Sequence, residues 1–161
     1  MIDKKRTACF TGHRDIPECR IEILKKLLDK AIEQLYSEGV KFYGAGGSYG
    51  FDALAEQAVL RARERHNDIA LILVLPCKEQ DKYWNTKMKA EYAEIVSKAN
   101  KVVYTSESYS NGCMHKRNRH LVDYSEHCVA YLTKNSGGTA YTVDYAVKKG
   151  LRIVNLGVYF K

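Results

Sequence analysis

Short apolar runs alternate with amphipathic segments along the whole chain. The apolar runs predict strands at residues 7–11, 40–45, 69–75, 101–104, 128–132 and 152–156. Apolar residues at helical spacing predict helices at residues 19–37, 50–65, 83–97, 114–124 and 138–149. The run at 69–75 is apolar almost throughout, as in a parallel strand covered on both faces. This alternation predicts an α/β fold in which a mainly parallel sheet of about six strands carries helices on both faces.

No linker, repeat or low-complexity tract interrupts this pattern. The 161 residues are expected to form one domain over residues 1–161, with a composition typical of soluble globular proteins: 45% hydrophobic and 28% charged. Residues 1–6 carry charges with no apolar stretch behind them, so no signal peptide is expected. The longest apolar run is too short to span a bilayer, so no membrane association is predicted.

Cysteine and histidine usage bears on compartment and metal content. The five cysteines are odd in number and lack CxxC spacing, which favours reduced thiols and a cytoplasmic location. His115 and His120 have no carboxylate or thiol at ligand spacing. We therefore predict neither a metal site nor a bound cofactor.

A polar loop follows nearly every predicted strand, at residues 11–14, 44–50, 76–80, 105–113 and 135–139. In parallel α/β sheets, ligands bind beyond the carboxyl ends of the strands, where the strand order reverses. These loops are therefore expected to gather at one edge. Segment 105–112 fits either a lid or a merely mobile loop.

Two of these loops are rich in glycine and open helices: GAGGSYGFD at 44–52 and SGGT at 136–139. Glycines let the backbone approach a ligand closely, and the first helical turn offers free N–H groups to an anion. With the first strand end, they predict a pocket for a phosphate-bearing ligand. The expected contacts are Thr11, Gly12, His13, Arg14, Gly44, Gly46, Gly47, Ser48, Gly50, Asp52, Gly137, Gly138, Thr139 and Thr142.

Each of these residues also has a simpler explanation. Glycines close turns, and Ser136 alone could cap the last helix. Asp52 could merely complement the helix dipole, and His13 with Arg14 could be an exposed pair. The first glycine loop departs from GxGxxG and follows the second strand, so a standard NAD dehydrogenase is not expected.

The predicted helix at 114–124 carries a mixed pattern. Met114, Asn118 and Leu121 share its inward face, and Arg117 lies at the border of that face. A buried amide needs partners, and a guanidinium at the border can reach a phosphate, so Arg117 and Asn118 join the predicted site. The alternative is a helix with a basic outer face, which suits Asn118 poorly. The formal net charge of +7 also favours an anionic ligand, although a solvated basic surface explains much of it.

Three motifs, taken in order, resemble those of the SLOG superfamily: YGAGGSYGFD, MHKRNRHLVDYSEHCVAYL and SGGTAYTVDYA. This Rossmann-like group contains the lonely-guy phosphoribohydrolases and the DNA-processing protein of bacterial transformation. TGHR and EQDKYW place the likeness nearest the YpsA/YoqJ-like branch. The resemblance covers the whole chain and implies a three-layer α/β/α sandwich, with a homodimer as one option.

Lonely-guy enzymes cleave the N-glycosidic bond of nucleoside 5′-monophosphates, and the resemblance carries their catalytic Arg onto Arg117 and their Glu onto Asp144. This chain has Asn118 where they have Lys, and Tyr141 where their Thr grips the phosphate. The shorter Asp144 carboxylate also sits farther from a bound sugar, and small misplacements slow catalysis greatly.

Because of these departures from the lonely-guy motif, we rank three functional hypotheses. The first is a cytoplasmic protein that binds a nucleotide or nucleotide-derived ligand, such as ADP-ribose or a nucleoside monophosphate, with a sensor role as one option. The second is a phosphoribohydrolase that uses Arg117 and Asp144. The third is a single-stranded DNA-binding protein, for which Arg14, Arg119 and Tyr109 would supply basic and aromatic contacts.

Overall fold

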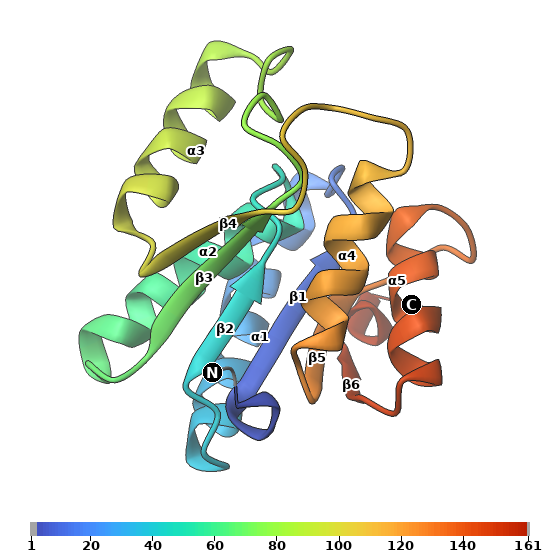
Figure 1. Cartoon of the computed structure of the whole chain (residues 1–161). Helices are drawn as coiled ribbons and strands as arrows, with labels where there is room; N and C mark the ends of the chain where they lie inside the picture. Colours follow the sequence, from blue (N-terminus) through green and yellow to red (C-terminus); the bar gives the residue numbers. More distant parts are fainter. Residues whose placement is uncertain (1–2, 161) are drawn as a thin grey trace.

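The protein is built around one six-stranded, all-parallel sheet (Figure 1). A computed structural model describes residues 3–160. The strands lie in the order β4-β3-β2-β1-β5-β6. Their bounds are β1 Thr7–Gly12, β2 Phe42–Ala45, β3 Ala70–Leu75, β4 Lys101–Tyr104, β5 His127–Tyr131 and β6 Arg152–Asn155.

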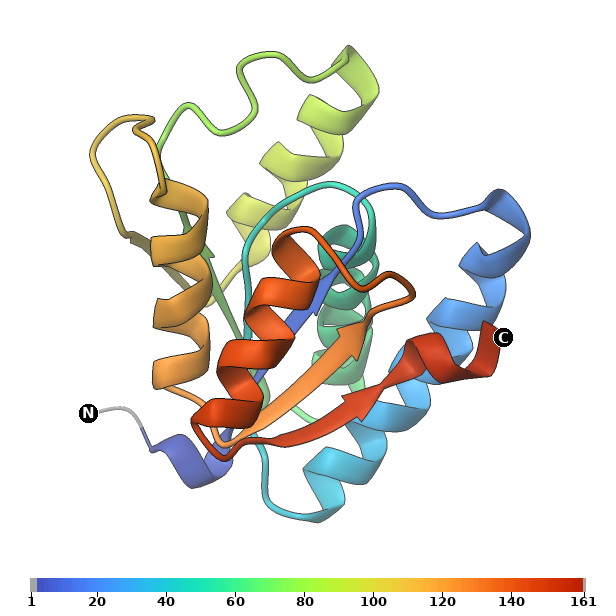
Figure 2. The same ribbon diagram turned by 90° about the vertical axis from the view of Figure 1, so that its right-hand side faces the viewer.

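Helices cover both faces of the sheet, which gives the three layers. In Figure 2 the strands lie between α4 on the left and α1 on the right. Helix α2 contacts both α1 and α3 on one face, and α4 packs against α5 on the other. Their bounds are α1 Glu18–Ser37, α2 Phe51–Arg65, α3 Thr86–Lys98, α4 Cys113–Asp123 and α5 Gly138–Lys148, with short 3-10 helices at Lys4–Arg6 and Leu156–Phe160.

The predicted order of elements is confirmed, and only their ends differ. Helix α3 begins at Thr86, three residues later than predicted, because the Asn85 side chain accepts a hydrogen bond from the Met88 amide at 2.8 Å and caps the helix there. The last strand stops at Asn155, one residue early, where the chain turns into the final 3-10 helix.

Each face of the sheet has its own apolar core. The larger one lies under α1 and α2, where Phe10, Tyr43 and Phe51 are at most 1% exposed. Helix α2 presents a row of small side chains, Ala55, Ala58 and Ala62, all fully buried, so it packs close to the strands. The smaller core lies under α4 and α5 and includes Cys9, Cys128, Leu121, Val122 and Ala146.

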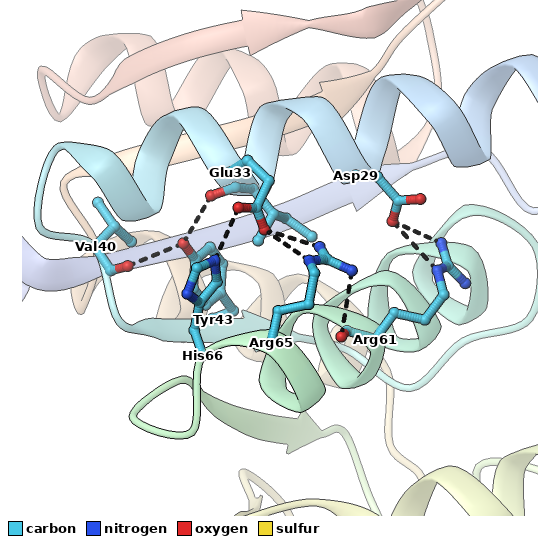
Figure 3. Close-up of polar contacts among 8 residues, drawn as sticks. Asp29, Glu33, Val40, Tyr43, Arg61, Arg65 and His66 are labelled. Carbon is cyan, nitrogen blue, oxygen red and sulfur yellow. Dashed lines mark hydrogen bonds and ion pairs between the residues drawn. The ribbon is translucent and has the colours of Figure 1, made fainter.

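Ion pairs on the protein surface join α1 to α2 (Figure 3). Glu33 contacts Arg65 and the His66 ring, each at 2.8 Å, and Asp29 contacts Arg61 at 2.9 Å. The hydrogen bonds from His66 and then Arg65 lower the pKa of the Glu33 carboxyl. Exposed pairs of this kind contribute little individually, about 0.2–1 kcal/mol each. Together they fix the orientation of α2, whose first turn carries Asp52 to the edge of the sheet.

Strand order reverses between β1 and β5. From β1 the sheet extends through β2, β3 and β4 on one side, and β5 pairs with β1 on the other. The chain leaves β1 toward α1 on one face and leaves β5 toward α5 on the opposite face. The two connections therefore diverge and leave a crevice beyond the carboxyl ends of these strands.

Candidate functional site

A cavity of about 380 Å³ lies at this strand-order reversal. It brings together residues from β1, the loop after β2, α4 and the start of α5. Ten of the residues predicted for the site line it: Thr11, Gly12, His13, Arg14, Ser48, Asp52, Arg117, Asn118, Gly138 and Thr139.

The N-terminus of α5 opens onto the cavity. Its first backbone hydrogen bond runs from the Tyr141 amide to the Gly137 carbonyl at 3.0 Å, which leaves the amides of the first turn outside the helical ladder. No side chain caps this end, and Gly137 takes a positive φ of 97°. A Cβ at Gly138 would meet no atom within 4 Å, so the approach to these amides is unobstructed. Lys134, in the loop before α5, also lines the cavity and adds a positive charge.

The end of β1 forms the opposite wall. The His13 Nε2 atom accepts a hydrogen bond from the Thr133 amide at 2.9 Å, which ties the β1 and β5 loops together. Burial, and then the charge of Lys134, lower the pKa of His13. The ring is therefore neutral at physiological pH and acts as an acceptor. Arg14 is exposed, and its guanidinium lies 5.2 Å from the Tyr49 ring centroid.

The glycines of loop 44–50 let other parts of the protein pack closely against this loop. A Cβ at Gly46 would lie 2.3 Å from Arg117, and one at Gly50 would lie 2.1 Å from the Arg14 carbonyl. The Gly47 amide donates to Glu56 Oε2 at 2.8 Å, so the protein's own carboxylate takes the N–H predicted for a phosphate. Gly44, Gly46, Gly47 and Gly50 are not among the residues that line the cavity, and their predicted part in ligand binding stays a prediction.

A buried charged cluster underlies this loop. Arg117 is only 5% exposed, and its Nη1 donates to the Gly46 carbonyl while its Nε donates to Asn118 Oδ1 at 2.7 Å. Asp52 accepts from the Ser48 amide at 3.3 Å. Burial raises the pKa of Asp52, and the charge of Arg117 opposes that rise. Burial and the Asp52 charge raise the pKa of Glu56 well above its usual range, which favours the neutral form of Glu56.

Three predicted residues lie apart from the cavity lining. The Asp144 side chain is 66% exposed and pairs with Lys148 at 3.1 Å, so the structure does not bring it to the cavity that Arg117 lines. The Thr142 hydroxyl donates to the Gly138 carbonyl at 2.8 Å within α5 and is not free for a ligand. Gly137 caps α5 outside the lining.

The predicted site lacked four residues that line the cavity, Phe10, Asp15, Met114 and Lys134, and it lacked Glu56 of the buried cluster. Glu56 follows Asp52 by one helical turn and stands among small apolar residues of α2, a spacing that already indicates a buried acidic pair. Lys134 comes two residues before the SGGT loop, and its position alone indicates a cation near the helix terminus.

Within residues 3–160 no group of three His, Cys, Asp or Glu residues is arranged to hold a metal ion. No helix in that part of the chain is long and apolar enough to cross a membrane.

The parallel sheet lies between two layers of helices, and the cavity lies where the strand order reverses. These two features define the protein as a member of the Rossmann-like α/β class. Residues 11–154 match the protein-family model YpsA, described as the YspA SLOG family. The chain therefore belongs to this SLOG family, and the resemblance drawn from its motifs is confirmed.

Relatives and solved structures agree with this assignment. The SPbeta prophage-derived protein YoqJ of Bacillus subtilis is 30% identical over 138 residues, covering 78% of this chain and 81% of its own. A UPF0398 protein of Halalkalibacterium halodurans is 26% identical over 132 residues, with 80% and 70% covered.

The DNA processing protein A of Streptococcus pneumoniae has a similar fold, with a TM-score of 0.66 and 16% identity; the match covers 93% of this chain and 50% of that one. Its Helicobacter pylori counterpart, described as binding single-stranded DNA, has a TM-score of 0.66 and 17% identity, with 93% and 64% covered. At these identities the likeness shows the fold. This chain spans half of the first structure and somewhat less than two thirds of the second.

Proposed function

We propose that the protein binds a nucleotide or nucleotide-derived ligand, with its phosphate at the N-terminus of α5. The observation that carries this proposal is the uncapped first turn of α5 opening on the cavity. Free amides and the positive end of the helix dipole attract an anion there. Lys134 and Arg14, both exposed, add positive charges to the lining.

The same cavity also contains groups that suit a sugar. The Asp52 carboxylate can accept hydrogen bonds from ribose hydroxyls. The Ser48 hydroxyl, in the same wall, is buried without a hydrogen-bond partner. A phosphate needs donors, which the α5 amides offer, and ribose hydroxyls can donate to the Asp52 carboxylate, so one cavity holds groups that match both parts of a nucleoside phosphate.

Binding fits this geometry better than hydrolysis does. A phosphoribohydrolase of the lonely-guy kind would need its carboxylate beside Arg117, whereas Asp144 is turned outward and paired with Lys148. Single-stranded DNA is the second candidate. The structural neighbour from Helicobacter pylori favours it, and Arg14 and Tyr109 lie together at a neighbouring cavity.

Calorimetry with AMP, ADP-ribose and ribose 5-phosphate tests the proposal. Gly138→Val should weaken AMP binding more than about tenfold, because a Cβ at this position meets no atom within 4 Å and the branched side chain would extend into the space proposed for the phosphate. Lys134→Ala should weaken binding by up to about fivefold, as expected for an exposed ion pair.

Lys116→Ala is the matched control, since Lys116 is also exposed but lies on the outer face of α4. It removes the same charge and should leave AMP affinity unchanged. Equal losses in the two lysine variants would mean that general surface charge attracts the ligand. Failure of the wild-type protein to bind any of the three ligands would refute the proposal.

A further inference from the structure

A second cavity, of about 710 Å³, lies beside the first. Arg14 and Met114 line both, so they form a shared wall at the junction. Tyr49, in the loop after β2, also lines it, next to Ser48 of the first cavity in sequence. The remaining residues of its lining come from the loop after β3 and from the loop before α4, and neither of these two loops contributes to the phosphate cavity.

Aromatic side chains dominate this second cavity. Tyr49 and Trp84 meet edge to face, with ring centroids 5.3 Å apart, and form its inner part. Tyr109 is 65% exposed and Tyr83 is 89% exposed, so two rings stand open to solvent at its rim. Exposed aromatic rings clustered at one cavity are unusual on a soluble protein surface and mark a binding site.

The cluster is held in place by polar contacts. The Tyr109 amide donates to Glu79 Oε1 at 3.1 Å, which joins the two loops that carry the rings. Gln80, in the wall, donates from Nε2 to the Gly46 carbonyl at 3.4 Å and so connects the cavity to the glycine loop. Its Oε1 is buried without a hydrogen-bond partner, which leaves an acceptor unsatisfied beside the aromatic rings.

From this arrangement we propose that the aromatic cavity holds the base of the nucleotide whose phosphate lies at α5. The inference rests on the proposed function and specifies where the rest of that ligand goes. Bases are planar and stack on aromatic side chains, a contact worth about 1–3 kcal/mol per base. Arg14, at the junction and over the Tyr49 ring, lies where the ligand passes from one cavity to the other.

Trp84 gives a direct readout of this cavity, because it is the single tryptophan of the chain. AMP should quench tryptophan fluorescence on binding, whereas ribose 5-phosphate, which lacks the base, should bind without quenching. Tyr109→Ala should weaken AMP binding about 5- to 150-fold, the range that corresponds to one stacked base. It should leave ribose 5-phosphate affinity unchanged, and Tyr109→Phe should retain AMP affinity because it keeps the ring.

Tyr159→Ala is the matched control, since Tyr159 is equally exposed, at 66%, but lies on the final 3-10 helix. It should change neither affinity. If AMP binds with no quenching and Tyr109→Ala has no effect, the base lies elsewhere and this inference is wrong, while the proposed function stands. If AMP, ADP-ribose and ribose 5-phosphate all fail to bind, both the inference and the proposed function are wrong. Quenching by an oligonucleotide but not by AMP would also overturn the inference, in favour of a nucleic-acid strand.

Discussion

Arg117 is a buried structural cation as well as a wall of the site. Its guanidinium bonds to the Gly46 carbonyl and balances Asp52 in a place that solvent scarcely reaches. Removal of one partner from a buried charge pair leaves the other uncompensated, which typically costs about 3–5 kcal/mol. Any loss of ligand affinity in Arg117→Ala will therefore contain a folding component.

We predict that Arg117→Ala lowers the free energy of unfolding by about 3–5 kcal/mol in urea titrations. Arg119→Ala, two positions along α4, should change it by less than about 0.5 kcal/mol, because Arg119 makes only an exposed contact with the Tyr141 hydroxyl, at 3.0 Å. Each variant loses one positive charge, so net charge is controlled. Similar losses in both would show that Arg117 does not balance a buried carboxylate.

At the scale of elements, a close contact near the site joins β1 to α2. A Cβ on Gly12 would lie 2.4 Å from the Phe51 side chain, and Phe51 is fully buried at the start of α2. Phe51 stacks on Tyr131 with ring centroids 5.9 Å apart, so it also supports β5. The absence of a side chain at Gly12 is therefore what lets α2 begin where it does.

Gly12→Ala should destabilise the protein by about 1–3 kcal/mol, the usual cost of overpacking a core. Gly138→Ala provides the comparison, because a Cβ there meets nothing within 4 Å and it should be neutral or slightly stabilising. Thermal and urea unfolding would measure both. If Gly12→Ala unfolds at the wild-type midpoint, the contact with Phe51 is not the constraint described.

At the scale of the whole molecule, the net charge of +7 determines how nucleic acid should behave. Basic residues are spread over several elements, so single-stranded DNA should bind weakly and lose affinity steeply as salt is raised from about 50 to 200 mM. Fluorescence anisotropy with a labelled oligonucleotide measures this. Tight binding at about 150 mM salt that disappears in Arg14→Ala would make single-stranded DNA the first candidate function.

The order of elements could be predicted from the sequence because periodicity reflects burial, and burial decides where strands and helices form. The ligand-facing loops followed from topology, and Thr11–Arg14, Gly138 and Thr139 lie where a parallel sheet places them. Helical spacing placed Arg117 at the border of the inward face of α4, and the structure buries it. The charges of Asp52 and Glu56, both on α2, favour its charged form there, an influence from a distant part of the chain that no local pattern encodes.

Asp144 shows where the assignment of a residue from the lonely-guy motif can fail. It follows the buried Thr142 by two residues, or about 200° around the helix, so it faces outward whatever the motif suggests. The glycines of loop 44–50 were assigned to a ligand because sequence cannot distinguish close approach to a ligand from close approach to Arg117.

The pairing of β1 with β5 also determines when this cavity can exist. Gly12 lies opposite Tyr131, so the two sides of the crevice are separated by roughly 120 residues of chain. During synthesis β1 is made early, and the edge that pairs with β5 stays unpaired until β5 has been made. Contacts so distant in sequence are slow to form. A chain cut before residue 127 lacks one wall of the pocket, so ligand capture by a nascent or truncated chain would report that β5 had already joined the sheet.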